Sequence, residues 1–310
     1  MRVLLTGATG FVGGRLLPAL LEAGHDVTVL TRDADGFDAP EGVAVVEGDL
    51  LDAGSFEAAL EGVEAAYYLV HSMGSADDED FAERDRRAAR NFAEAASDAD
   101  VDRVIYLGGL GGDEDELSKH LKSRRQVEAV LSEGEYDLTT LRAAIIVGDG
   151  SASFRMVRQL SGRLPMMVTP EWVRTECQPI AIDDVVRYLV AVLDVPETAG
   201  ETYEIGGPDV LTYGAVLERT AKQLGRSPLI LPVPVLSPRL SSYWVELVTD
   251  VPRSVARPLI DGLKNPVVVT DHRIEELIPF ERTPFDVAVS RALGEESSRR
   301  RRLGAEALPR

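Results

Sequence analysis

Three glycines at three-residue spacing have the clearest chemical role in the sequence. Gly7, Gly10 and Gly13 follow a short apolar run, residues 3–5, and precede a helical pattern. Glycine lets a chain turn sharply off a strand, lets backbone N–H groups approach a diphosphate closely, and lets the next helix pack tightly on the sheet. The N-terminus of that helix attracts negative charge. We therefore expect a diphosphate-binding turn made of Gly7, Ala8, Thr9, Gly10, Phe11, Val12 and Gly13.

The cofactor preference depends on the end of the next predicted strand, residues 27–31. An acidic residue there binds a ribose 2′-hydroxyl and favours NAD, whereas an arginine neutralises a 2′-phosphate and favours NADP. Arg32 comes directly after the strand and Asp33 follows it. We expect NADP(H) to be favoured over NAD(H), the alternative being that Arg32 and Asp33 form a surface ion pair.

The third predicted strand, residues 42–47, places two residues beside the same crevice. Asp49 can reach an adenine there, and Leu50 can cover it. The alternative is that Asp49 or Asp52 caps the next helix, which is predicted over 55–61. The sequence is consistent with both the adenine contact and the helix cap.

Two further strand ends complete the predicted cofactor site. The strand predicted over 65–70 ends at Val70 and His71, where the second ribose of a dinucleotide should pass. The sixth strand begins at Asp137 and leaves the sheet where a nicotinamide should lie. At its exit we expect four residues beside the ring, namely Ala143, Ala144, Ile145 and Ile146.

The elements that must position these residues alternate regularly. Short apolar strand patterns and helical patterns follow one another six times within the first 150 residues. This predicts an α/β fold, a Rossmann-type doubly wound parallel sheet with ligands beyond the carboxyl ends of its strands. After Gly150 the pattern breaks into short helices, strands and prolines, which predicts a smaller C-terminal α+β lobe.

The alternation also predicts a domain organisation. A dinucleotide-binding domain over 1–150 is joined by 179–207, which returns to the sheet with a seventh strand. A substrate or capping lobe comprises 151–178 and 208–294, and 295–310 form a flexible basic tail. Within the lobe an apolar helical stripe forms either core or pocket wall, and it consists of Leu240, Tyr243, Trp244 and Leu247.

Three expectations concern polar residues outside the cofactor site. His25 has no partner nearby in the sequence and is expected to be a solvent-facing loop residue. Asp183 is expected to cap a helix over 184–193. In the helix predicted over 78–96 the charged residues form the solvated face, and the core face consists of Phe81, Ala88, Phe92 and Ala95.

The charge balance of the chain is strongly acidic. Of its 310 residues 45% are hydrophobic, the formal net charge is −19, and only four of the 33 basic residues are lysines. Such a composition is typical of halophilic proteins, because concentrated salt screens the self-repulsion of the charges. The negative charge argues against a nucleic-acid partner.

Cysteine usage and hydropathy indicate the cellular compartment in which the chain is expected to work. Cys177 is the only cysteine, which excludes an intramolecular disulfide and favours a reducing cytoplasm. The first apolar run ends at Thr6, too early for a secretory signal, and no apolar run is long enough to span a membrane. No cluster of His, Cys and Asp has metal-ligand spacing, so no metal is expected.

Taken together, four segments resemble the extended and atypical short-chain dehydrogenase/reductases. They are residues 6–13, 49–50, 179–185 and 205–208. The nearest resemblance is to NAD(P)H-binding proteins akin to NmrA-like regulators, isoflavone-reductase-like enzymes and the Rossmann-type accessory subunit of respiratory complex I. Three more segments are similar to one bacterial and archaeal group within that branch, namely residues 67–73, 160–182 and 240–244.

The chain departs from the family where typical members do proton chemistry. Those members use a Tyr-x-x-x-Lys pair on one helix face, assisted by a serine or threonine at the end of the fifth strand. Here that strand ends in Gly108 and Gly109. If the registers correspond, His120 replaces the tyrosine as general acid, and Arg124 replaces the lysine and orients the cofactor. The alternative is that His120 is a surface residue and the site does no chemistry.

The resemblance implies an NADP(H)-dependent oxidoreductase that acts on a small hydrophobic carbonyl or enone-type substrate. In such an enzyme the cofactor supplies the hydride and the protein positions it. The alternative is a non-catalytic NADP(H)-binding sensor or assembly factor of the NmrA type, with a protein partner. A nucleotide-sugar epimerase or dehydratase is the third reading, and it requires the tyrosine that this helix lacks.

Overall fold

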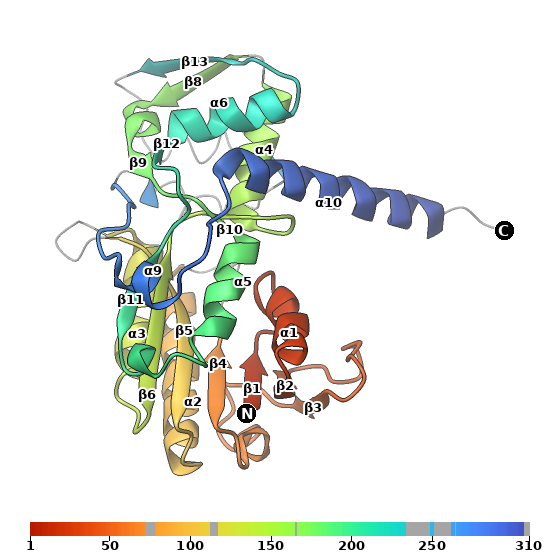
Figure 1. Ribbon diagram of the computed structural model, residues 1–310, viewed down its shortest axis with the longest axis vertical. Coiled ribbons are helices and arrows are strands. Elements are labelled where there is room, and N and C mark those ends of the chain that lie inside the picture. The colour runs from red at the N-terminus through yellow and green to blue at the C-terminus, as the bar shows by residue number, and fades with distance from the viewer. Residues whose placement is uncertain are drawn as a thin grey trace.

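A seven-stranded parallel sheet forms the lower body of the molecule (Figure 1). The structure is a computed structural model that describes residues 1–71, 78–111, 117–164, 166–233, 249–250, 262–263 and 265–306. Every neighbouring pair of strands in this sheet runs parallel. In spatial order the strands are β11 (Thr202–Ile205), β6 (Asp137–Ala143), β5 (Arg103–Gly109), β4 (Ala65–Tyr68), β1 (Arg2–Thr6), β2 (Asp26–Thr31) and β3 (Ala44–Glu47). This confirms the predicted doubly wound Rossmann-type sheet.

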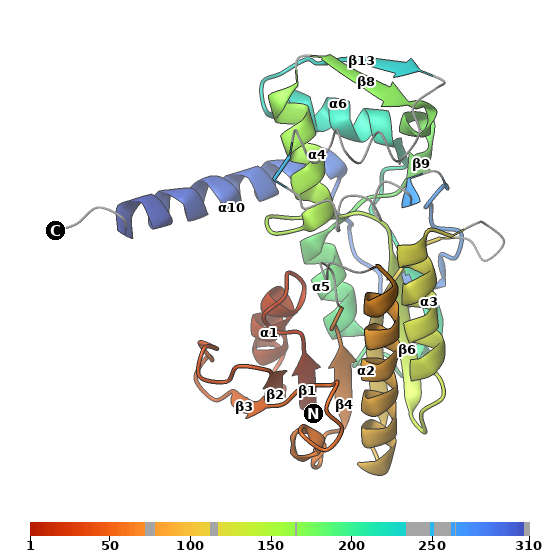
Figure 2. The ribbon, with the colours of Figure 1, turned by 180° about the vertical axis from the view of Figure 1, so that it is seen from behind.

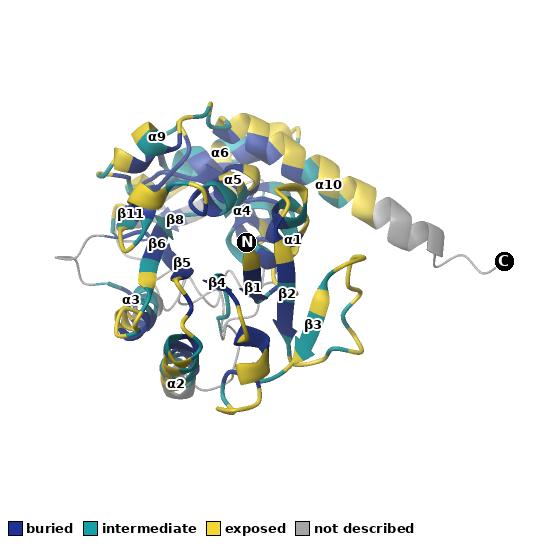
Figure 3. Cartoon of the chain, turned by 60° about the horizontal axis from the view of Figure 1, so that its bottom comes forward, coloured by how far each residue is buried: buried dark blue, intermediate teal, exposed yellow. Residues whose placement is uncertain are grey.

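Helices cover both faces of the sheet, so its central strands are apolar on both sides. All four residues of β4 are buried, as are four of the five in β1. Helices α1 (Gly13–Glu22) and α5 (Ile182–Ala191) pack on one face, and α2 (Asp78–Asp98) and α3 (Lys119–Leu131) pack on the other (Figures 1 and 2). The buried strands are dark blue in Figure 3.

The chain builds a second apolar cluster above the carboxyl ends of the strands. Its main helices are α4 (Ala152–Arg163) and α6 (Tyr213–Gln223), which contact each other. Three two-stranded sheets accompany them: β7 (Ile146–Val147) with β10 (Ile180–Ala181), β9 (Glu176–Cys177) with β12 (Leu211–Thr212), and β8 (Met166–Pro170) with β13 (Leu229–Val233). The α+β lobe predicted after Gly150 is therefore present.

The C-terminal part of the described chain is helical. After the short helix α9 (Arg273–Leu277) comes α10 (Phe285–Glu306), which projects away from the body (Figure 1). Its first turns are anchored in the lobe core by Ala288, Val289 and Ala292. Residues 295–306, for which the sequence predicts a flexible tail, lie in this helix.

Several predicted element boundaries are wrong. The helix predicted over 55–61 is a 3₁₀ helix, η1 (Glu57–Leu60); two more 3₁₀ turns are η2 (Glu171–Arg174) and η3 (Pro196–Thr198). Asp183 does not cap α5, whose N-cap is Ala181 and has no side-chain cap; Asp183 instead pairs with Arg291 at 3.0 Å. Because the helix begins at Ile182, one residue earlier than Asp183, this side chain lies in the first turn and not at the N-cap.

His25 is also placed wrongly by the sequence. It is 9% exposed instead of solvent-facing, and its backbone N–H donates to the carbonyl of Leu20 in the turn that closes α1. Neither ring nitrogen has a hydrogen-bond partner among the described residues. Burial, together with the nearby N-terminal ammonium group, lowers the pKa of His25 below its ordinary value of 6.5.

The burial of His25 predicts a pH effect on stability. Because its folded pKa is depressed, the unfolded chain binds the proton more tightly, and the free energy of unfolding falls as pH drops from 6.5 toward the folded pKa. Replacing His25 by leucine is expected to reduce the pH dependence of the free energy of unfolding below pH 6.5. At pH 5.5 it is expected to raise that free energy by about 1 kcal/mol. Urea unfolding of both proteins at pH 5.5 and 8 checks this, and an equal slope with pH would contradict it.

Candidate cofactor and substrate site

The glycine turn between β1 and α1 is closed by its own backbone. The carbonyl of Gly7 accepts a hydrogen bond from the N–H of Gly10 at 2.9 Å. Gly7 has a φ of +71°, and a Cβ there would lie 2.7 Å from the carbonyl oxygen of Leu69. A Cβ on Gly13 would overlap the Gly7 carbonyl. The tight packing at Gly13 is thus against the turn itself and not, as expected, against the sheet.

The first turn of α1 offers free backbone donors. No side chain caps this helix. The N–H groups of Phe11 and Val12 donate to no other protein group in the described part of the chain. Donors at a helix N-terminus, beside glycines that leave room for a ligand, suit the diphosphate of a dinucleotide. The residues present therefore fit the group that the motif predicts.

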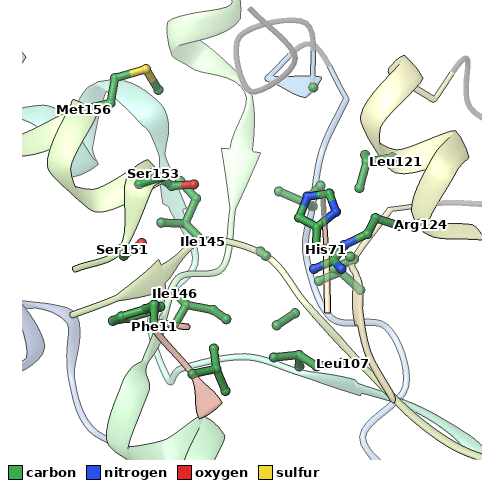
Figure 4. A pocket seen from close by; sticks show the side chains of 18 of the residues that line it. Phe11, His71, Leu107, Leu121, Arg124, Ile145, Ile146, Ser151, Ser153 and Met156 are labelled. Carbon is green, nitrogen blue, oxygen red and sulfur yellow. The ribbon is translucent and has the colours of Figure 1, made fainter. Parts of the chain in front are cut away.

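A cavity of 430 Å³ opens beside this turn, beyond the carboxyl ends of β1, β4, β5 and β6. Figure 4 shows Phe11 and Ile146 on one side of it, and His71 and Arg124 on another. The strand ends add Leu69 from β4 and Leu107 from β5. This is the edge at which doubly wound sheets bind their ligands.

The far part of the cavity is apolar. It lies between α4 and α6 and is lined by Met156, Val157, Leu160, Val216, Leu217 and Leu263. Of the lining side chains that the structure describes, Arg124 alone carries a permanent charge, and His71 alone carries an imidazole. The arrangement suits a dinucleotide at the turn and an uncharged, apolar second ligand beyond it.

His71 is a lining residue whose protonation is set by its burial and by two charged neighbours. Its Nδ1 lies 3.2 Å from Oδ2 of Asp85, which comes from α2. Burial and the Arg124 guanidinium lower the pKa of His71 below 6.5, and the hydrogen bond to Asp85 opposes them. Arg124 is held against the ring of Tyr106, whose hydroxyl donates to the Arg124 carbonyl at 3.2 Å.

Most of the predicted site residues line the cavity. Those that do are Gly7, Gly10, Phe11, Val12, Gly13, His71, Arg124, Ala143, Ala144, Ile145 and Ile146. Their roles toward a ligand stay predictions. Ala144 and Ile145 form the break between β6 and β7, which turns the chain from the sheet into the lobe.

The remaining predicted residues lie outside the cavity lining. Ala8 is buried under the turn, Thr9 is exposed, and Val70 packs against the core below α2. Arg32 is exposed after β2, and within the described residues it forms no ion pair with Asp33, which accepts from the N–H of Gly36.

Asp49 and Leu50 follow β3. The Asp49 carboxylate accepts from the N–H of Leu51 at 3.0 Å, while Leu50 is buried. The N-cap of η1 is Phe56 and has no side-chain cap, so the capping alternative for Asp49 or Asp52 is wrong.

Some predictions fall outside what the structure describes. His120 lies in α3, but its side chain is not among those described. The stripe from Leu240 to Leu247 lies in the part of the chain without a description. The roles given to these residues stay predictions.

Sequence reasoning missed Asp85 and the apolar wall. Asp85 was assigned to the solvated face of its helix, yet it is 4% exposed and binds His71. One signal was available, since Asp85 lies on the Ala88 and Phe92 side of α2 at helical spacing. The wall residues of α4 show the same spacing, but nothing in the sequence separates a pocket wall from a core.

Other chemistry finds little support in the described residues. Burial raises the pKa of the Cys177 thiol to about 12, which makes it a poor nucleophile. Over the described ranges no three His, Cys, Asp or Glu side chains are grouped to hold a metal ion. None of the described helices has the length and hydropathy needed to cross a membrane.

Comparison with known proteins agrees with the geometry. A family model described as NAD(P)H-binding matches residues 7–194. The chain is 27% identical over 235 residues to a ceramide reductase of Caulobacter vibrioides, covering 75% of this chain and 73% of that protein. It is 24% identical over 307 residues to subunit 9 of the NADH dehydrogenase [ubiquinone] 1 alpha subcomplex of Arabidopsis thaliana, covering 91% of this chain and 75% of that protein.

The fold is shared with solved structures at lower identity. The triphenylmethane reductase of Citrobacter sp., solved with NADP(H), superposes with a TM-score of 0.75 at 19% identity. The match covers 94% of this chain and 100% of that chain. At this identity the likeness establishes the fold alone.

Proposed function

Because the chain belongs to the NAD(P)H-binding family of atypical short-chain dehydrogenase/reductases, we propose that it is an NADP(H)-dependent reductase of small apolar carbonyl or enone compounds. The observation that carries this proposal is a continuous cavity that joins the glycine turn to an apolar wall. Reductases among its relatives, such as the ceramide reductase, support the reaction class.

The residues of the chain have separate tasks in this proposal. Backbone N–H groups of the turn hold the diphosphate, and Asp49 and Leu50 contact the adenine end. Val70 and His71 border the second ribose, while residues 143–146 flank the nicotinamide. When bound, the cofactor supplies the hydride. The apolar wall of α4 and α6 binds the substrate and excludes water.

The preference for NADP(H) rests on Arg32. Its side chain is exposed after β2 and has no carboxylate partner among the described residues, so it is available for a 2′-phosphate. Arg32→Glu is expected to raise the Kd for NADPH by about 30-fold, or about 2 kcal/mol, and to leave the Kd for NADH within about threefold. Arg226→Glu, the same charge change at an exposed site on the lobe, is the control. Equal weakening for both dinucleotides would contradict the assignment.

The test of the proposed function is a turnover assay. Purified protein with NADPH deuterated at the transferred position is offered a panel of apolar aldehydes, ketones and enones. We expect loss of NADPH absorbance and deuterium in the reduced product. Tight NADPH binding without turnover of any compound would contradict the reductase and favour the NmrA-type sensor or assembly factor.

Finer expectations from the sequence belong to the same proposal. We propose that residues 1–150 with 179–207 act as the dinucleotide-binding domain, and that 151–178 with 208–294 act as the substrate lobe. The single cysteine and the net charge of −19 support a reducing, salt-rich cytoplasm as the working environment.

A further inference from the structure

We infer that His71, held in place by Asp85, is the group that delivers the proton to the substrate as it is reduced. This inference rests on the proposed reductase function and assigns His71 a role beyond the ribose contact expected from the sequence. It also makes Asp85 a positioning residue.

The exit of β4 is fixed against the glycine turn, which sets the place of His71. The hydroxyl of Thr6 donates to the Tyr67 carbonyl at 2.8 Å and accepts from the N–H of Leu69 at 3.1 Å. The carbonyl of Leu69 in turn lies in the space that a Cβ on Gly7 would need. The chain therefore leaves β4 in contact with the turn, and His71 follows two residues later on the wall of the cavity.

Asp85 fixes the imidazole in a way that suits proton transfer. It is almost fully buried on α2, and its Oδ2 lies 3.2 Å from Nδ1 of His71. A carboxylate on one ring nitrogen orients the ring and stabilises the imidazolium form. Figure 4 shows His71 beside Arg124 at the cavity.

The other described polar side chains on the cavity wall fit this task less well. The hydroxyls of Ser118 and Ser151 cap α3 and α4, where each accepts from a backbone N–H at 3.3 Å. Burial raises the pKa of Tyr213 far above its usual value, and Arg124 does not release its proton. Ser153 also lines the cavity, but its alkyl hydroxyl releases a proton far less readily than an imidazolium, so His71 is the described lining group best suited to deliver one.

The step balances as follows for a carbonyl substrate. The reduced nicotinamide gives a hydride, two electrons and a hydrogen nucleus, to the carbonyl carbon, and a C–H bond forms as the C=O π bond breaks. The imidazolium of His71 gives a proton to the oxygen. The products are an alcohol, the oxidised dinucleotide and a neutral imidazole, which regains its proton from water.

The surroundings of His71 set the sign of the pH dependence. The charged groups that act on it are Asp85 on α2 and Arg124 on α3. Burial and Arg124 lower the pKa of His71 below its ordinary value, and the reduction rate falls as pH rises through this lowered pKa, because the imidazolium is then lost. Asp85→Asn moves this fall in the rate to lower pH, and Arg124→Gln moves it to higher pH.

The experiment compares His71→Gln and the isosteric Asp85→Asn with wild type. We expect His71→Gln to lower kcat by about 100-fold or more, a much larger effect than on the Kd for NADPH, which reports only the loss of the ribose contact. His272→Gln is the control, since His272 is exposed and pairs only locally with Glu275 at 2.9 Å. NMR titration of the four histidines of the full chain, with and without NADPH, gives a readout independent of turnover.

The outcomes separate the inference from the proposed function. Retention of kcat in His71→Gln, or an unmoved His71 titration in Asp85→Asn, would overturn the inference and leave the reductase standing. If His120→Gln instead lost turnover and the fall in rate with rising pH, the proton would be assigned to His120. Absence of turnover in the wild type with NADPH bound would overturn both.

Discussion

Replacing Gly13 by alanine is expected to weaken NADPH binding by about 100-fold, which corresponds to about 2.7 kcal/mol. A Cβ at this position would overlap the carbonyl of Gly7 and crowd Cα of Ala8, both of them backbone groups that no side-chain rotation can move. The turn must open to make room, and the N–H groups of Phe11 and Val12 then lose their alignment. Calorimetric titration with NADPH measures the effect.

The neighbouring residue Gly14 provides a matched control. A Cβ there would lie 3.3 Å from the carbonyl oxygen of Ala8, and Gly14 is inside α1. Gly14→Ala is expected to bind NADPH as the wild type does and to be as stable or slightly more stable, since alanine favours a helix. Equal loss of NADPH binding in both variants would show that the region tolerates no added methyl group. It would contradict the claim that the contact of Gly13 with the Gly7 carbonyl keeps the turn in its binding shape.

Replacing Asp184 by alanine is expected to lower the free energy of unfolding by about 3 kcal/mol. The Asp184 carboxylate is 1% exposed at the start of α5 and accepts from the N–H of Thr283 at 2.7 Å and from its hydroxyl at 3.0 Å. These bonds tie a helix on the sheet to the chain that leads into α10. Without the carboxylate, the partly buried N–H and hydroxyl of Thr283 lose their acceptor.

The adjacent Asp183 supplies the control for this prediction. Its side chain is half exposed and pairs with Arg291 at 3.0 Å. Asp183→Ala is expected to change stability by about 0.5 kcal/mol or less, because exposed ion pairs contribute little. Urea unfolding of both variants at neutral pH makes the comparison, and similar losses would contradict the role given to Asp184.

The sheet and the cofactor turn could be predicted because their signals are local in the sequence. A strand, three spaced glycines and a helix follow one another without interruption, and this pattern can be recognised from neighbouring residues alone. The strand ends then meet at one edge because parallel strands share a direction, which is why residues from Gly7 to Ile146 were expected at one site and line one cavity.

The missed features depend on contacts between distant segments. Asp85 is 14 residues from its partner His71, and its burial follows from how α2 lies on β4. The same holds for His25, which is 9% exposed in the folded chain, and for Asp184, whose partner is 99 residues away. A polar or charged side chain is expected to be exposed when only its residue type is considered. The folded structure is needed to show that these three side chains are buried.

The central claim is that the first turn binds the diphosphate of NADPH with its backbone. Calorimetric titration of the purified chain with NADPH and NADH, in molar KCl, tests it most directly. The account predicts one site per chain with a Kd in the micromolar range, about −8 kcal/mol, tighter for NADPH than for NADH. No heat and no thermal stabilisation with either dinucleotide would contradict it.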